Sequence, residues 1–158
     1  MKVIDEDGVL RYVAERPAAA MRGEERTVPK IRHLAVICMN PEKLAEFYTE
    51  VFEMEVVGRN KSGGVFLSDG YMNLALLKQQ AVGKSPGLNH FGFHVEDADE
   101  IARRMSKWDV VGPEKRPADR TYAEQRGTDP EGNNFDIAEG GFDREAAERK
   151  KAKTPVDA

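Results

Sequence analysis

The middle of the chain contains two short apolar runs that each open with a histidine. Residues 33–37 read His-Leu-Ala-Val-Ile, and residues 90–94, 57 positions further on, read His-Phe-Gly-Phe-His. Both runs are short and rich in β-branched or aromatic residues, a pattern typical of buried strands. The equal placement of the two opening histidines predicts an internal repeat.

Helix signals follow each apolar run at the same distance. Asn40 and Asp97 each stand seven residues after the opening histidine, and both residue types favour the N-cap position of a helix. Pro41 takes the first helical position, and Asp97 with Glu100 fits a capping box. The apolar positions that recur at helical spacing are Leu44, Phe47, Tyr48, Val51 and Phe52 in the first predicted helix, and Ile101, Ala102, Met105 and Trp108 in the second.

Strand signals then recur in both halves, so each half reads βαβββ. A Val-Val-Gly sequence after each helix predicts a second strand, and a glycine-containing turn further on predicts a hairpin. The segments that carry these signals are 55–58, 65–67 and 74–76 in the first half, and 109–112, 121–123 and 135–137 in the second.

These elements predict an α+β fold built from two tandem βαβββ modules. The modules cover residues 30–78 and 87–142, which form one domain. Residues 1–29 contain one short amphipathic piece followed by small and charged residues, and we expect an irregular extension or one docked on a neighbouring subunit. Residues 143–158 are charged and have few apolar side chains to offset the entropy of ordering, so we expect a frayed tail.

Charge and hydropathy exclude several classes of function. The chain has 24 basic and 28 acidic side chains, a formal charge of −4, and no basic block interleaved with aromatics, so nucleic acid is not an expected partner. No apolar stretch is long enough to span a membrane, and the first residues lack the order of an export signal. Cys38 is the only cysteine. The cytoplasm is therefore the expected compartment.

The two histidines that open the repeated strands are the strongest chemical signal. Duplicated modules usually pair about a pseudo-twofold axis, which places His33 and His90 where both imidazoles can bind one ion. A single histidine at a strand end is more often a hydrogen-bonded, half-buried side chain, but the paired placement favours metal binding.

Asp136 supplies the carboxylate that such a metal site needs. It lies between Phe135 and Ile137 at an interior-type strand position, where a carboxylate without a cation is costly to bury. The alternative is a solvent-facing aspartate on an edge strand. With His33 and His90 it forms a triad with open positions for water or substrate.

Further candidates for chemistry lie beside these ligands. His94 shares the strand parity of His90 but is about 13 Å further along, too far to bind the same ion, so we expect it to act in acid–base chemistry or substrate binding. Tyr122 and Arg126 are expected on the strand before Asp136, as groups for proton transfer and for holding an anionic or enolic substrate. The alternatives are a core tyrosine and a solvated arginine.

The first module lacks a second candidate ligand. Asp136 stands four residues after the turn glycine Gly132, and the residue four after Gly70 is Leu74, which cannot bind a metal. We therefore expect the first module to contribute only His33.

Four segments of the chain resemble the vicinal oxygen chelate superfamily, which includes glyoxalase, bleomycin-resistance proteins, epimerases and extradiol dioxygenases. The resemblance covers about residues 30–142, and its most specific part is the segment Asp-Pro-Glu-Gly-Asn-Asn-Phe-Asp at 129–136. The other segments are Arg-His-Leu-Ala-Val at 32–36, Leu-Ala-Glu-Phe-Tyr at 44–48 and Asn-His-Phe-Gly-Phe at 89–93.

The resemblance implies a cupped mixed sheet around a metal, the glyoxalase/dioxygenase-like fold, with ligands at His33, His90 and Asp136. Asp136 stands where many members have glutamate, so either the strand lies closer to the metal, a water bridges, or Glu139 substitutes through a bulge. Leu74 departs from the acidic ligand of glyoxalase-type members, which makes the pattern more similar to the dioxygenases.

The resemblance therefore implies a divalent-metal enzyme, with Fe, Mn, Zn or Ni, that acts on a small oxygen-rich substrate. The reaction is either extradiol-dioxygenase-like or that of a lyase or isomerase. One alternative is a non-catalytic binding protein of the bleomycin-resistance kind, and another is a vestigial site on a dimer scaffold. A homodimer is expected under all three hypotheses.

Overall fold

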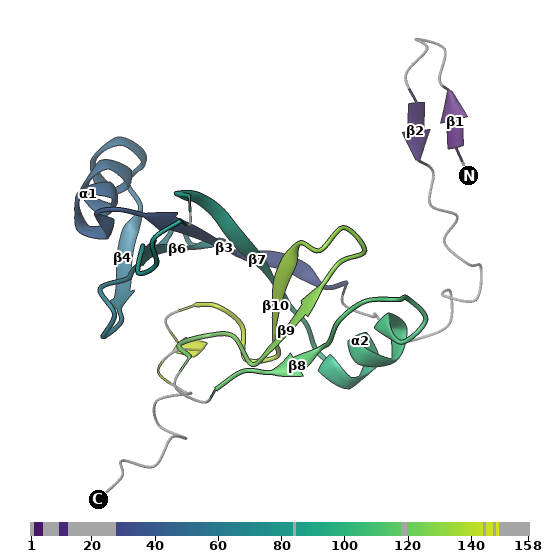
Figure 1. Ribbon diagram of the computed structural model, residues 1–158. Helices are drawn as coiled ribbons and strands as arrows, with labels where there is room; N and C mark the ends of the chain where they lie inside the picture. The colour runs from purple at the N-terminus through teal and green to yellow at the C-terminus, as the bar shows by residue number, and fades with distance from the viewer. Residues whose placement is uncertain are drawn as a thin grey trace, which may run out of the picture.

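The computed structural model describes residues 2–4, 10–12, 28–83, 85–117, 120–143, 145–146 and 148, and an eight-stranded mixed sheet forms its centre (Figure 1). The strand order across this sheet is β4-β5-β6-β3-β7-β10-β9-β8. The first module forms one half of the sheet, from β4 to β3, and the second module forms the other half, from β7 to β8. This arrangement confirms the predicted α+β fold of two βαβββ units. The strands are β3 (Lys30–Cys38), β4 (Glu55–Arg59), β5 (Val65–Ser68), β6 (Asn73–Lys78), β7 (Gly87–His94), β8 (Glu114–Lys115), β9 (Gln125–Thr128) and β10 (Asn134–Ala138).

Helix α1 (Pro41–Phe52) begins where the sequence predicts. The Asn40 side chain accepts a hydrogen bond from the Lys43 backbone N–H at 3.1 Å, and Pro41 occupies the first turn. The helix packs on β4, β5 and β6. Only part of its predicted apolar stripe packs against the sheet, and Phe47, Val51 and Phe52 remain exposed.

Helix α2 (Ala98–Met105) occupies the equivalent place in the second module. The Asp97 side chain accepts a hydrogen bond from the Glu100 backbone N–H at 2.8 Å, which is one of the two hydrogen bonds of the predicted capping box. The Glu100 carboxylate forms ion pairs with Arg103 and Arg104, with N···O distances of 2.7 and 2.9 Å. The apolar residues that pack together between this helix and the sheet are Phe93, Val95, Ala98, Ile101, Met105, Phe135 and Ile137.

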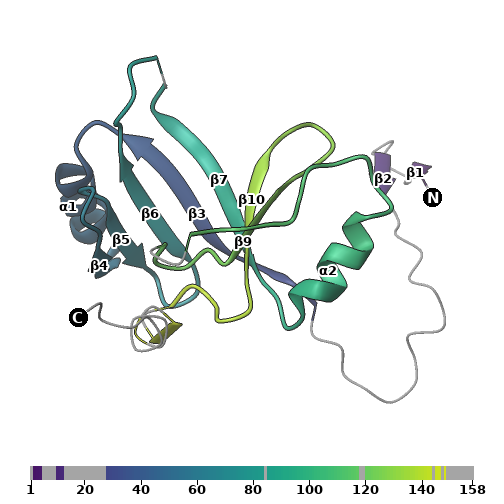
Figure 2. The same cartoon turned by 60° about the horizontal axis from the view of Figure 1, so that its bottom comes forward.

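Both helices cover the same face of the sheet, one near each end (Figure 2). Leu34 on β3 pairs directly with Phe91 on β7, so side chains of this parity point to one face in both modules. Val36 and Cys38 pack in the cluster under α1, and Phe93 packs in the cluster under α2. Residues at the alternate positions of each strand face the opposite side of the sheet, and these include the two predicted ligand histidines, His33 and His90.

The two modules join through the antiparallel pairing of β3 with β7. Within each module the last strand is parallel to the first, β6 to β3 and β10 to β7. Register irregularities occur between Ile31 and His33 and between Ala35 and Val36. They bracket the ladder in which His33 pairs with Gly92 and Ala35 pairs with His90.

The second module departs from the prediction at two strands. Strand β9 begins at Gln125, so the strand predicted at 121–123 is wrong and Tyr122 lies in the segment before it. The strand predicted at 109–112 is replaced by the two-residue β8. Gly112 has a φ of +95°, and a Cβ there would lie 2.7 Å from the Arg126 carbonyl oxygen, so this close approach requires glycine and turns the chain before β8.

The flanks are described only in part. In the predicted irregular extension, β1 (Lys2–Ile4) and β2 (Leu10–Tyr12) pair as a separate antiparallel sheet, and the other residues before Val28 lie outside the described part of the chain. Most of the predicted frayed tail also lies outside it. Within that tail Ala146 is buried, and its N–H donates to the Asp143 side chain at 2.7 Å.

No helix in the part of the chain that the structure describes is long and apolar enough to cross a membrane.

The capping of α1 gives a direct test of this local structure. Asn40→Ala removes the acceptor for the Lys43 N–H and should lower the free energy of unfolding by about 1 kcal/mol. Asn40→Ser keeps an oxygen at the N-cap and should retain most of that stability. Urea unfolding followed by circular dichroism measures both variants, and equal losses would contradict the capping role.

Candidate metal centre

Three buried side chains from the two modules converge on the sheet face opposite the helices. His33 on β3, His90 on β7 and Asp136 on β10 are 4%, 6% and 2% exposed. One ligand atom from each lies within 4.8 Å of the others, and the two imidazole centroids are 5.4 Å apart. Strand pairing accounts for this, because Gly92, two residues after His90, pairs with both His33 and Asp136.

Each histidine is oriented by an asparagine. His33 Nδ1 lies 2.8 Å from the side-chain oxygen of Asn73, and His90 Nδ1 lies 2.7 Å from that of Asn89. An amide oxygen only accepts hydrogen bonds, so each Nδ1 must carry a proton. In a neutral imidazole this leaves the lone pair on Nε2, the tautomer that binds a metal through Nε2.

The Asp136 carboxylate is held between two donors. Arg126 Nε donates to Oδ1 at 2.6 Å, and His90 Nε2 lies 3.0 Å from Oδ2. Burial acts to raise the pKa of Asp136, but the hydrogen bonds from His90 and Arg126 outweigh burial and lower the pKa to about 2. The carboxylate is therefore ionised at neutral pH. His90 Nε2 and one carboxylate oxygen of Asp136 are two of the atoms that would hold a divalent cation.

His33 is neutral at physiological pH. Burial, the largest cause, and the neighbouring His90 together lower its pKa from 6.5 to about 4, although the hydrogen bond from Nδ1 to Asn73 acts in the opposite direction. The Asn73 Nδ2 atom is itself buried and has no hydrogen-bond partner among the described residues.

Two aromatic rings pack beside His33. The Phe142 ring is stacked on the His33 imidazole, with centroids 4.8 Å apart and an interplanar angle of 12°. The Tyr122 ring lies 6.2 Å from His33 and 6.1 Å from Phe142, and both aromatic residues are buried. Residues that follow the first module in the sequence therefore help to bury the His33 imidazole.

The other residues singled out in the sequence lie around the centre at different distances. Arg126 contacts it directly through Asp136, and Tyr122 packs beside His33. His94 is exposed, and its Nε2 lies 3.2 Å from the Glu139 carbonyl oxygen. The Glu139 carboxylate accepts a hydrogen bond from the Ala98 N–H at 2.7 Å, so it binds the first residue of α2.

The register also corrects one equivalence between the modules. Asp136 pairs with Gly92, and the matching pair in the first module is Ala35 with Ala75. Ala75, rather than Leu74, is therefore the counterpart of Asp136. Ala75 offers no ligand atom, so the first module still supplies only His33 among its counterpart positions.

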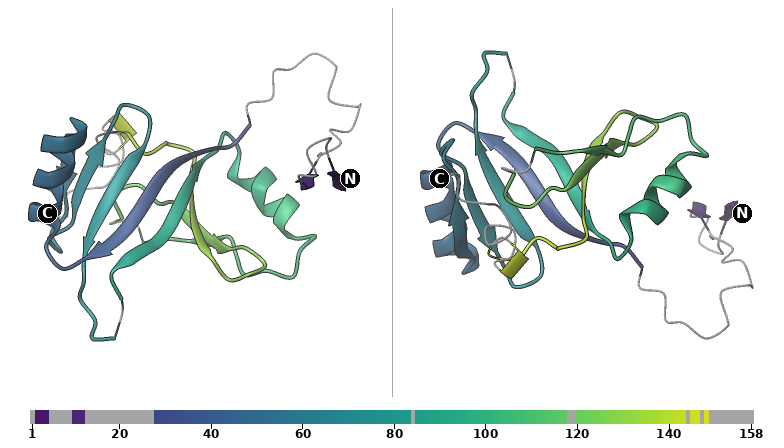
Figure 3. Two further views of the ribbon diagram at one scale, coloured as in Figure 1. Left: turned by 90° about the horizontal axis from the view of Figure 1, so that it is seen from above. Right: turned by 90° about the horizontal axis from the view of Figure 1, so that it is seen from below.

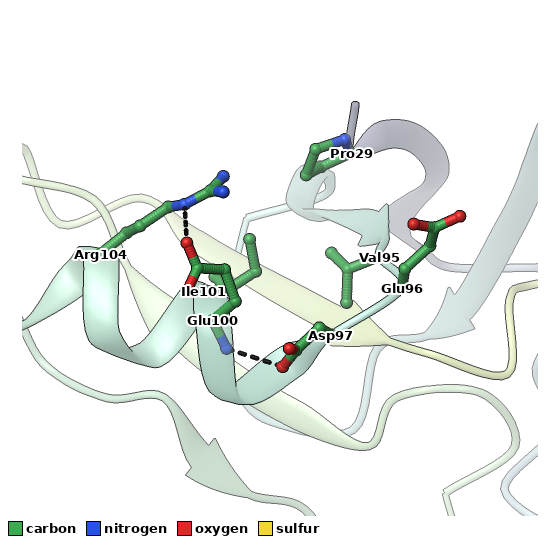
Figure 4. A pocket seen from close by; sticks show the side chains of 7 residues that line it. All are labelled: Pro29, Val95, Glu96, Asp97, Glu100, Ile101 and Arg104. Carbon is green, nitrogen blue, oxygen red and sulfur yellow. Dashed lines mark hydrogen bonds and ion pairs between the residues drawn. The ribbon is translucent and has the colours of Figure 1, made fainter. Parts of the chain in front are cut away.

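A groove at the start of α2 is separate from this centre. A groove of about 410 Å³ lies at the start of α2, on the helix-covered side of the sheet (Figure 4). Its polar groups already interact with one another: Asp97 caps the Glu100 N–H, and Arg104 donates to the Glu100 carboxylate. The groove is lined by Pro29, Val95, Glu96, Asp97, Glu100, Ile101 and Arg104.

The donor set fits one divalent cation. Two imidazoles and one carboxylate suit Fe, Mn, Zn and Ni, and three protein ligands leave positions open for water or substrate. The asparagines that hold each Nδ1 and the arginine that holds Asp136 are outer partners of the kind that fix metal ligands. Sequence reasoning missed Asn73, Asn89 and Phe142, although Asn89 directly precedes its histidine.

Comparison with known proteins gives one family and a consistent fold. Residues 30–137 match the model of the Glyoxalase/Bleomycin resistance protein/Dioxygenase superfamily. No curated protein matches the chain significantly.

Solved structures share the fold at low identity. A hypothetical protein from Bacillus halodurans C-125 has a TM-score of 0.57 and 16% identity, over 71% of this chain and 94% of that one. A methylmalonyl-CoA epimerase from Mycobacterium tuberculosis has a TM-score of 0.56 and 15% identity, over 76% and 93%. A 2,3-dioxygenase from Pseudomonas sp. KL28 has a TM-score of 0.56 and 20% identity, over 75% of this chain but only 42% of the dioxygenase.

The neutral buried state of His33 predicts the pH dependence of stability in metal-free protein. An unfolded histidine takes up a proton near pH 6.5, whereas folded His33 does so only near 4, so protonation between these values favours unfolding. Stability should be highest above pH 6.5 and fall by about 3 kcal/mol by pH 4. His33→Gln should flatten this slope in urea titrations, and His94→Gln should leave it unchanged. A slope that persists in His33→Gln would contradict the assignment.

Proposed function

Because the chain belongs to the glyoxalase/bleomycin resistance protein/dioxygenase superfamily, we propose that it is an enzyme that uses one divalent metal ion to act on a small, oxygen-rich substrate. The proposed ligands are His33, His90 and Asp136. The proposed reaction is extradiol-dioxygenase-like or a lyase or isomerase reaction. The homodimer and the cytoplasmic location expected from the sequence stay predictions.

One observation carries this proposal: three buried ligand atoms from both modules lie within 4.8 Å of one another. Buried carboxylate and imidazole groups need partners for all their polar atoms, and Arg126 occupies only Oδ1 of the Asp136 carboxylate. Asn73 and Asn89 also present both histidines in the tautomer suited to metal binding. A purely structural polar cluster has no need for this shared orientation.

The residues around the centre have separate proposed roles. A bound divalent ion would act as a Lewis acid toward vicinal oxygens of the substrate. Arg126 keeps Asp136 ionised through Oδ1 and leaves Oδ2 for the ion. Tyr122, buried beside His33, is better placed for proton transfer than the exposed His94, for which we propose a role in binding substrate at the edge of the site.

A second candidate function is small-molecule binding without a metal. The observation that favours it is the ion pair between Arg126 and Asp136, which balances the carboxylate charge without any metal ion. Under this alternative His33 and His90 only shape the pocket. Protein stripped with EDTA would then bind its ligand as tightly as untreated protein.

Metal content tests the leading proposal. Protein purified without chelator or affinity metal should contain about one equivalent of a divalent ion by elemental analysis. His33→Ala and Asp136→Ala should lose it, because each removes one of only three ligands, and Asn89→Ala should bind it about 10- to 100-fold more weakly.

His94→Ala is the matched control, since it removes a histidine from the same strand as His90 but outside the centre. It should retain the metal. If His33→Ala and Asp136→Ala keep the wild-type metal content, the ion is bound elsewhere and the proposal is wrong.

A further inference from the structure

One side of helix α1 exposes an apolar patch to solvent. The side chains of Phe47, Val51 and Phe52 are 49%, 55% and 60% exposed. The rings of Phe47 and Phe52 lie 5.9 Å apart, and Val51 is one helical turn after Phe47, so the three side chains form one continuous patch. Helix α1 lies on the outside of the sheet, at the end of the molecule that the first module forms (Figure 3). A continuous apolar patch in such a place is typical of a surface that binds another molecule.

The apolar patch is separate from the flank of α1 that is tied to the edge of the sheet. On that flank Glu42 pairs with Arg59 of the edge strand β4, with an N···O distance of 2.8 Å. Thr49, seven residues after Glu42, lies on the same flank. At 3.6 residues per turn, Phe47 and Val51 lie roughly 140° and 180° around the helix axis from Glu42. The contact with β4 therefore leaves the apolar flank open.

Two charged side chains lie at the two ends of this apolar flank. Lys43, Phe47 and Val51 are spaced four residues apart, so they form a ridge along one side of α1, which we call the α1 ridge. Glu50, seven residues after Lys43, lies beside the far end of this ridge. Lys43 and Glu50 are exposed, and neither forms an ion pair with a described residue. The ridge therefore runs from a positive charge through an apolar centre to a negative charge.

This order of charges is complementary to itself when it is reversed. If a second copy of α1 lies antiparallel to the first, Lys43 of each copy faces Glu50 of the other, and the two Phe47 rings meet at the centre. A parallel arrangement would place Lys43 beside Lys43 and Glu50 beside Glu50, and these like charges repel. Identical patches that meet in opposite directions form an isologous twofold interface, the commonest interface of homodimers.

We propose that the α1 ridge is the contact surface of a homodimer in which two α1 helices pack antiparallel about a twofold axis at Phe47. This dimer is independent of the proposed metal chemistry, because His33 and His90 face the opposite side of the sheet. Helix α1 has 12 residues and is about 18 Å long, so the interface is at the small end of specific interfaces. We expect a dissociation constant of about 1–100 μM.

Exchange of the two charges gives the first test, by sedimentation equilibrium of the full chain. Lys43→Glu and Glu50→Lys should each weaken the dimer at least tenfold, because each variant places like charges opposite one another. The double variant Lys43→Glu/Glu50→Lys should return to within threefold of wild type, because the exchanged charges pair again. Thr49→Glu adds a charge on the opposite flank, so it is the matched control and should stay within threefold of wild type.

Three outcomes of this test would overturn the proposal. Wild-type protein that remains monomeric well above about 100 μM has no such interface. Equal dissociation constants for wild type and both single variants would place the dimer contact on another surface. A double variant as weak as the single variants would reject the antiparallel pairing of Lys43 with Glu50. Circular dichroism verifies that each variant is folded.

A cross-linking test locates the twofold axis without reversing any charge. Phe47→Cys places two thiols side by side at the axis, so oxidation with diamide should link two chains into a covalent dimer. Thr49→Cys, on the opposite flank, should cross-link at least tenfold more slowly. The native Cys38 is buried and present in both variants, so it does not account for a difference between them. Absence of cross-linking in Phe47→Cys, or equal rates for the two variants, would overturn the proposal.

Discussion

The pairing of β3 with β7 is the constraint on which the rest of the structure depends. It joins two βαβββ modules into one sheet, and its central ladder sets His33 against Gly92 and Ala35 against His90. A shift of one residue would turn one histidine toward the helix-covered face. Register irregularities lie on both sides of this ladder. The register that brings the candidate ligands of both modules together therefore holds only over this short stretch.

The charges and hydrogen bonds at that point are compatible with a bound cation. Asp136 is ionised and buried; Arg126 donates to one of its oxygens, and His90 Nε2 lies 3.0 Å from the other. A divalent cation bound by these side chains would need no rearrangement of the sheet, because His33 is already neutral and its ligand atom lies within 4.8 Å of those of His90 and Asp136.

The sequence contained most of the fold because repetition and periodicity are local signals. The two histidine strands, the caps at Asn40 and Asp97, and the first-module hairpin all follow from short patterns. The second module was harder, since the strand near Tyr122 and the path at Gly112 depend on packing between distant segments. The sequence did not indicate Asn73 and Phe142 as site residues for the same reason: their place at the site comes from contacts with His33, which is distant in the sequence.

Anomalous diffraction from crystals of the metal-loaded protein tests the central claim most directly. The account predicts one anomalous peak at roughly 2.0–2.3 Å from Nε2 of His33, Nε2 of His90 and one carboxylate oxygen of Asp136. In such crystals His90 and Asp136 would no longer share a hydrogen bond, while Arg126 would remain on Oδ1. A peak that lacks either histidine, or the absence of any peak at this centre, would contradict it.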